Sequence, residues 1–66
     1  MLVERLAKRI KALREQRGLS QESLAAKAGV SRGDLARLET GRHDPTVGTV
    51  EKLAKALRVK VTDLLK

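Results

Sequence analysis

The chain has 66 residues, so it forms one domain at most, and 41% of its residues are apolar, which is enough for a folded core. It has no Cys, Phe, Tyr or Trp, which excludes disulfides, thiolate–metal sites and the aromatic platforms on which single-stranded nucleic acids stack. Fifteen Lys and Arg against eight Asp and Glu give a net charge of +7. This charge favours nucleic acid as a partner, then a membrane surface, although a basic surface without any such partner is the plain alternative.

The first helix is expected over about residues 3–17, where Val3, Leu6, Ile10 and Leu13 recur at helical spacing. Gly18 can end it with a left-handed cap. Charges interrupt the apolar pattern of "MLVERLAKRIKALREQ", which is unlike a signal peptide, and no apolar run has the length of a membrane span. We therefore expect a single domain over residues 1–66 in the cytoplasm, associated with the nucleoid if the nucleic acid favoured by its charge is DNA.

Two short helices are expected next, over about residues 20–28 and 31–40. Ser20 is a good N-cap for the first of them, and Gly29 can end it. Ser31 is the N-cap of the other, and Asp34 follows it at capping-box spacing. Gly41 ends this helix.

A fourth helix is expected after Thr46, because Pro45 disfavours helix at the residue before it. The residues expected on its inner stripe are Val47, Val50, Leu53, Ala54 and Leu57. A last short helical turn is expected over residues 61–65. Together these segments predict an all-α fold.

Two short helices joined by a turn of about three or four residues form a helix-turn-helix unit. Leu35 and Leu38 would anchor one face of the helix over residues 31–40. The opposite, free face would carry Arg32, Gly33, Ala36, Arg37 and Thr40. Small residues permit close approach to another surface, and arginines can reach past them to base edges or to phosphates.

The stretch "LSQESLAAKAGVSRGDLARLETG" resembles the helix-turn-helix of the phage repressor/Cro type, also called the Xre family. The later stretches "PTVGTVEKLAKALRV" and "VTDLL" are similar to the last two helices of that family, so the resemblance covers about residues 5–65. It implies a compact five-helix bundle that contains a helix-turn-helix and is similar to the lambda repressor.

The resemblance implies that the helix over residues 31–40 enters the major groove of DNA. The residues expected to face the bases are Ser31, Arg32, Gly33, Ala36 and Arg37. Arginine pairs best with guanine, so each half-site should contain a guanine, unless both arginines contact only phosphates. Three residues depart from the family pattern or its chemistry. Gly33 replaces a base-reading side chain, Asp34 is acidic beside a phosphate surface, and Arg58 replaces the usual Gly after the fourth helix.

The family also implies phosphate contacts around this helix. The residues expected to make them are Ser20, Gln21, Thr40, Arg42 and His43. Ser20 is first an N-cap, Gln21 is alternatively a solvated residue, and the lone His43 is alternatively a plain loop residue. Arg14 and Glu39 resemble a family ion pair between the first and third helices, against the alternative of two solvated charges.

The leading interpretation is a sequence-specific regulator of transcription, most simply a repressor, that binds double-stranded DNA as a homodimer on a pseudo-palindromic operator. The residues expected at the dimer interface are Val59, Val61, Leu64 and Leu65. No cofactor, metal, small-molecule ligand or membrane is expected. The alternatives are a protein-interaction module with the same bundle and an enzyme, although no nucleophile–base pair is apparent. The sequence does not separate a phage repressor from an antitoxin-type regulator or a restriction–modification controller.

Overall fold

The computed structural model describes residues 2–42 and 44–65, and the regular structure in these residues is helical. The helices are α1 (Leu2–Gln16), α2 (Gln21–Ala28), α3 (Arg32–Glu39), α4 (Val47–Leu57) and α5 (Val61–Leu64). Every predicted segment is present, so the prediction of an all-α, five-helix fold is confirmed. Over the described residues, none of the helices has the length and apolar character needed to cross a membrane.

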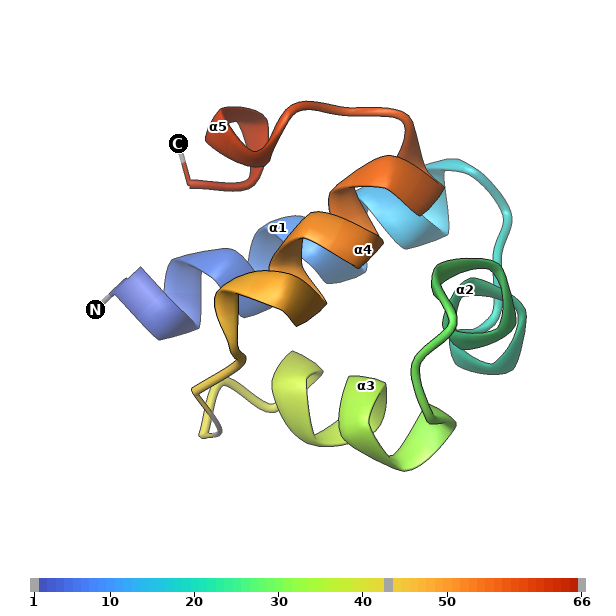
Figure 1. Ribbon diagram of the computed structural model, residues 1–66, viewed down its shortest axis with the longest axis horizontal. Coiled ribbons are helices and arrows are strands. Elements are labelled where there is room, and N and C mark those ends of the chain that lie inside the picture. Colours follow the sequence, from blue (N-terminus) through green and yellow to red (C-terminus); the bar gives the residue numbers. More distant parts are fainter. Residues whose placement is uncertain (1, 43, 66) are drawn as a thin grey trace.

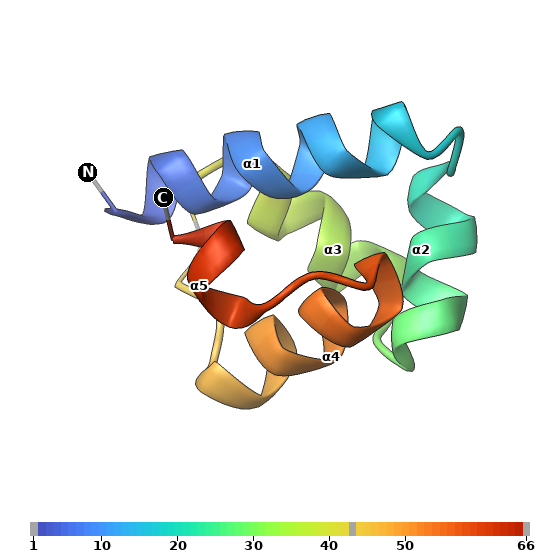
Figure 2. The ribbon, with the colours of Figure 1, turned by 90° about the horizontal axis from the view of Figure 1, so that it is seen from above.

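The helices surround one core, and α3 covers only one side of it. Figure 2 shows α1 and α4 on opposite sides of the molecule, with α2 at one end and α5 near the other. In Figure 1, α3 forms the lower edge, whereas α5 lies at the top. Helix α3 packs against α1 and α2, and α5 packs against α1 and α4. One face of α3 is therefore held by the bundle, and the other is free.

The core of the described residues is built from aliphatic side chains. The largest fully buried ones are Ile10, Leu24, Leu35, Leu53, Leu57 and Leu64. Each of the five helices contributes at least one of them. Full burial of such a side chain stabilises the fold by about 1.5–3 kcal/mol. Because every helix buries at least one of them, removal of any one helix would lose this stabilisation and expose part of the core.

Two expectations about apolar residues are wrong. Val47 was expected on the inner stripe of α4, but it is 75% exposed, whereas Val50 one turn later is 8% exposed. Val47 is the first residue of α4, where the helix extends beyond the core that covers its later turns. Leu64 was expected at a dimer interface, but it is completely buried because α5 packs against α1 and α4. Leu64 is therefore a core residue of the single chain.

Local hydrogen bonds begin three of the helices as the sequence predicted. The side chains of Ser20, Ser31 and Thr46 each accept a hydrogen bond from the backbone N–H three residues later, at 3.0, 3.0 and 3.1 Å. Each such cap stabilises its helix by about 1 kcal/mol. These caps place the starts of α2, α3 and α4.

The end of α4 is strained, because Arg58 takes the left-handed conformation that Gly29 takes after α2. Its φ is 59°, and every other described residue with positive φ is a glycine. The N–H of Arg58 donates to the carbonyl of Lys55 at 3.1 Å, so the cap itself is formed. A side chain in this conformation costs about 1–2 kcal/mol, which Gly avoids.

Replacement of Arg58 by Gly should therefore raise the free energy of unfolding. The relief of about 1–2 kcal/mol is partly offset by the larger unfolded-state entropy of Gly, about 0.5–1 kcal/mol, and the middle values of these ranges leave a net gain of about 0.7 kcal/mol. Urea unfolding followed by circular dichroism measures it. Arg58→Ala is the control, because Ala removes the same side chain and keeps the strain. Equal stability of the Gly and Ala variants would contradict the prediction.

Candidate nucleic-acid interface

The bend between α2 and α3 is made by Gly29, Val30 and Ser31. Gly29 has φ 72°, a conformation that suits glycine, and Val30 N–H donates to the carbonyl of Ala25 at 3.0 Å. Ala25 is 3% exposed, so a small residue occupies the buried side of α2 near the bend. Ser31 then caps α3 through the backbone N–H of Asp34. Local chemistry thus sets the angle at which α3 leaves the turn.

Helix α3 has one buried face and one exposed face. Leu35 and Leu38 are 1% and 2% exposed, which anchors the helix in the core. Of the residues predicted to face DNA, Ser31, Arg32, Gly33 and Arg37 are exposed, whereas Ala36 is half-buried. A Cβ built on Gly33 would meet nothing within 4 Å, so no contact within the described residues requires glycine there. The exposed face of α3, defined by these five residues, is available to a partner.

Glu39 connects three helices through one carboxylate. Arg14 of α1 donates from Nε to Glu39 Oε2 at 2.8 Å and from Nη2 to Oε1 at 3.1 Å. Gln21 Nε2, at the start of α2, donates to the same Oε1 at 3.0 Å. The side chains of Arg14 and Glu39 are only 10% and 4% exposed. The end of α3 is therefore tied to both α1 and α2 by charge-assisted hydrogen bonds.

The groups around the Arg14 guanidinium stabilise its charged form. Its Nη1 also donates to the carbonyl of Leu19 at 2.7 Å, so each guanidinium nitrogen has an acceptor. The hydrogen bonds that Arg14 donates to the Glu39 carboxylate raise the pKa of Arg14 above its ordinary value, against the opposing effect of burial. The ion pair anticipated from the resemblance is present, and the bond to Gln21 adds a third member that was not anticipated.

A second contact lies on the exposed face of α3 itself. Arg37 Nη2 donates to Asp34 Oδ1, and the two side chains are 66% and 51% exposed. Asp34 was interpreted as the capping-box partner of Ser31; its backbone N–H does bond to Ser31, while its carboxylate contacts Arg37. The spacing of three residues on a helix could have predicted this ion pair. Arg32, in contrast, makes no ion pair within the described residues.

The residues predicted to contact phosphates differ in whether their side chains have an N–H or O–H group left to donate to a phosphate. Thr40 Oγ1 donates its proton to the carbonyl of Arg37 at 2.6 Å, and Ser20 donates to Ser23 Oγ at 3.0 Å. In this arrangement neither hydroxyl has a second proton for a phosphate, which disfavours both predicted contacts. The Arg42 guanidinium is exposed and makes no bond within the described residues. The predicted contact of His43 lies outside the described residues.

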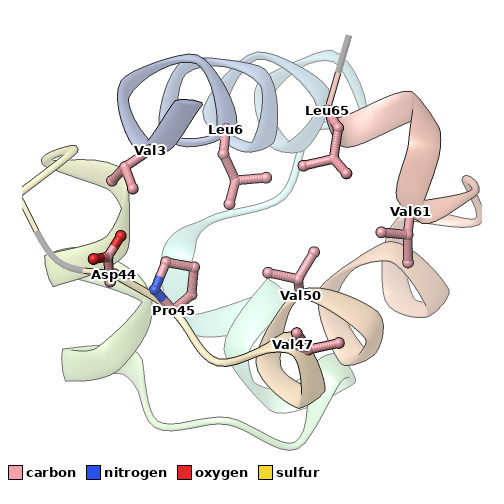
Figure 3. A pocket seen from close by; sticks show the side chains of 8 residues that line it. All are labelled: Val3, Leu6, Asp44, Pro45, Val47, Val50, Val61 and Leu65. Atoms are coloured by element: carbon pink, nitrogen blue, oxygen red, sulfur yellow. The ribbon is translucent and has the colours of Figure 1, made fainter. Parts of the chain in front are cut away.

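An open apolar groove of about 270 Å³ lies next to the loop that follows α3 (Figure 3). The residues that line it are Val3, Leu6, Asp44, Pro45, Val47, Val50, Val61 and Leu65. The two exposed large apolar side chains of the described residues, Val47 at 75% and Leu65 at 41%, both belong to this lining. Of the residues predicted at a dimer interface, Val61 and Leu65 line the groove and Val59 packs half-buried on the core.

Within residues 2–42 and 44–65, no group of three or more His, Cys, Asp and Glu side chains is arranged to hold a metal ion. The exposed face of α3 carries the residues predicted to face DNA, and the apolar groove is lined by two of the residues predicted at a dimer interface.

Comparison with known proteins identifies similar helix-turn-helix chains. A family model described as Helix-turn-helix matches residues 10–64. The chain is 42% identical over 60 residues to the immunity repressor protein of Bacillus phage phi105, a match that covers 91% of this chain. It spans only 42% of that repressor's length.

Two solved structures are similar along most of their length. The restriction-modification controller protein C.AhdI from Aeromonas hydrophila superposes with a TM-score of 0.90 at 32% identity, covering 94% of each chain. The master regulator for biofilm formation SinR, crystallised in complex with DNA, gives a TM-score of 0.87 at 35% identity. That match covers 92% of this chain and 98% of SinR.

Proposed function

The chain belongs to the HTH_3 family of helix-turn-helix proteins, and on that premise we propose that it is a transcriptional regulator that binds double-stranded DNA through α3. The observation that carries this proposal is the exposed face of α3, where two arginines stand among small residues. Such a face fits a major groove, because small side chains permit close approach and arginine reaches base edges. The phage repressor and the DNA-bound SinR among its relatives support the same function.

We assign each contact with DNA from the hydrogen-bond donors that a side chain does not already use within the protein. Arg32 and Arg37 face the bases, and Ala36 is suited to a thymine methyl group. Arg42, whose guanidinium is exposed beyond α3, contacts a phosphate. Gln21 gives one amide N–H to Glu39 and keeps a second for a phosphate beside the start of α2.

We further propose that the protein binds as a homodimer through the apolar groove. The groove holds the two exposed large apolar side chains, and a second copy would remove both from water. Its lining comes from α1, α4, α5 and the loop that follows α3 and includes no residue of the exposed face of α3, so a partner there leaves that face free (Figure 3). In such a dimer a two-fold axis would relate the two copies of α3, which favours pseudo-palindromic operators with half-sites about one turn apart. Repression is the simplest regulatory outcome, because the bound dimer would occupy the operator.

Selection from a random duplex DNA pool at near-physiological salt tests this function. We expect enrichment of a pseudo-palindrome with a guanine in each half-site. Arg37→Ala should lose preference at that guanine, a discrimination of about 1–3 kcal/mol. Arg42→Ala should weaken binding to every sequence and reduce the slope of log affinity against log salt by about one. Absence of duplex binding would overturn the proposal and favour a protein-interaction module.

A further inference from the structure

The contact between Arg37 and Asp34 affects the part of α3 that the proposed function places against DNA. Both side chains are more than half exposed, so the contact lies on the surface and not in the core. An exposed ion pair of this kind contributes little to folding stability. The larger consequence is for what Arg37 can bind, because the Arg37 guanidinium donates a hydrogen bond to the Asp34 carboxylate on the exposed face of α3.

The carboxylate changes what Arg37 can recognise. A guanidinium has five N–H donors in a rigid fork, and the bond to Asp34 Oδ1 uses one of them while it restricts rotation of the side chain. The remaining donors can pair with guanine O6 and N7, which requires an oriented fork. A phosphate instead attracts positive charge, and the Asp34 carboxylate offsets the charge of Arg37 and repels phosphates.

We propose that Asp34 is a positioning residue that directs Arg37 to a guanine and away from the phosphates. Arg37, and not Arg32, is then the main determinant of sequence preference. Arg32 makes no ion pair within the described residues, so no carboxylate there offsets its charge or restricts its rotation. This inference rests on the proposed entry of α3 into the major groove.

A purely structural role of Asp34 makes a different prediction. An acid in the first turn of a helix stabilises the helix dipole, and Glu22 occupies the first turn of α2 as Asp34 does that of α3. If this were all, removal of either acid would lower stability slightly and leave the preferred bases unchanged. Glu22→Ala is thus a matched control, because it removes the same charge from the neighbouring helix.

The test compares the unmodified chain with Asp34→Ala, Arg37→Ala and Glu22→Ala in the random-pool selection, and then measures the salt dependence of binding to one fixed duplex. We expect Asp34→Ala to reduce the preference for one guanine about tenfold, at the same position that Arg37→Ala affects. We expect its salt slope to steepen by about one as Arg37 moves to a phosphate. Glu22→Ala should keep both properties. Asp34→Ser, which lacks the carboxylate, replaces Asp34→Ala in the test if the latter unfolds.

The outcomes separate this inference from the proposed function. Enrichment by the unmodified chain together with an unchanged guanine preference in Asp34→Ala would overturn this inference alone. Equal loss of preference in Glu22→Ala would also overturn it, because the change in net charge, and not the contact with Arg37, would then explain the effect. No enrichment by the unmodified chain would overturn the proposed function and this inference with it.

Discussion

Glu39→Ala should lower the free energy of unfolding by about 3 kcal/mol or more, since it leaves a buried charge without its partner. Arg14, with a side chain 10% exposed, would lose both hydrogen bonds to the carboxylate, and Gln21 would lose its acceptor. A core of this size supplies only about 3–5 kcal/mol, so much of the variant should be unfolded at room temperature. Urea unfolding followed by circular dichroism measures the loss.

Two companion variants identify the cause of that loss. Glu22→Ala removes an exposed acid and should change stability by about 0.5 kcal/mol or less. The double variant Arg14→Leu with Glu39→Leu should recover much of the loss, because it removes both buried charges together. A Glu39→Ala variant as stable as the unmodified chain would show that the carboxylate does not hold α3 in place.

Val47→Asp should leave the single domain folded and prevent dimerisation. Val47 is 75% exposed at the first position of α4, whose first turn has no acid, so Asp there suits the helix dipole. In the proposed dimer the same change buries a charge in the apolar groove, which is strongly unfavourable. Because linked half-sites raise affinity about 10²–10⁴-fold, binding to a two-half-site duplex should weaken by about 100-fold or more.

Sedimentation equilibrium and DNA binding measure the two effects of Val47→Asp. Gly48→Asp is the matched control: it adds the same charge one residue further along α4, at an exposed position that does not line the groove. It should remain dimeric and bind the duplex normally. If Val47→Asp dimerises like the unmodified chain, the partner does not occupy this groove.

The sequence alone was enough for features that depend on near neighbours in the chain. The caps at Ser20, Ser31 and Thr46 each need a hydrogen bond over only three residues. The anchored face of α3 follows from the helical spacing of Leu35 and Leu38. Because such spacing also identifies the opposite face, the exposed residues of α3 could be predicted before any tertiary contact was known.

Tertiary structure decided the features that depend on distant parts of the chain. Glu39 meets Arg14 and Gln21 across 25 and 18 residues; resemblance to a family suggested the first contact, and nothing in the spacing suggested the second. Periodicity assigned Val47 to the core and could not place Leu64 in the four-residue helix α5. Val47 is exposed and Leu64 is buried because of how far α4 extends and where α5 packs, since an apolar side chain is buried only where another element covers it.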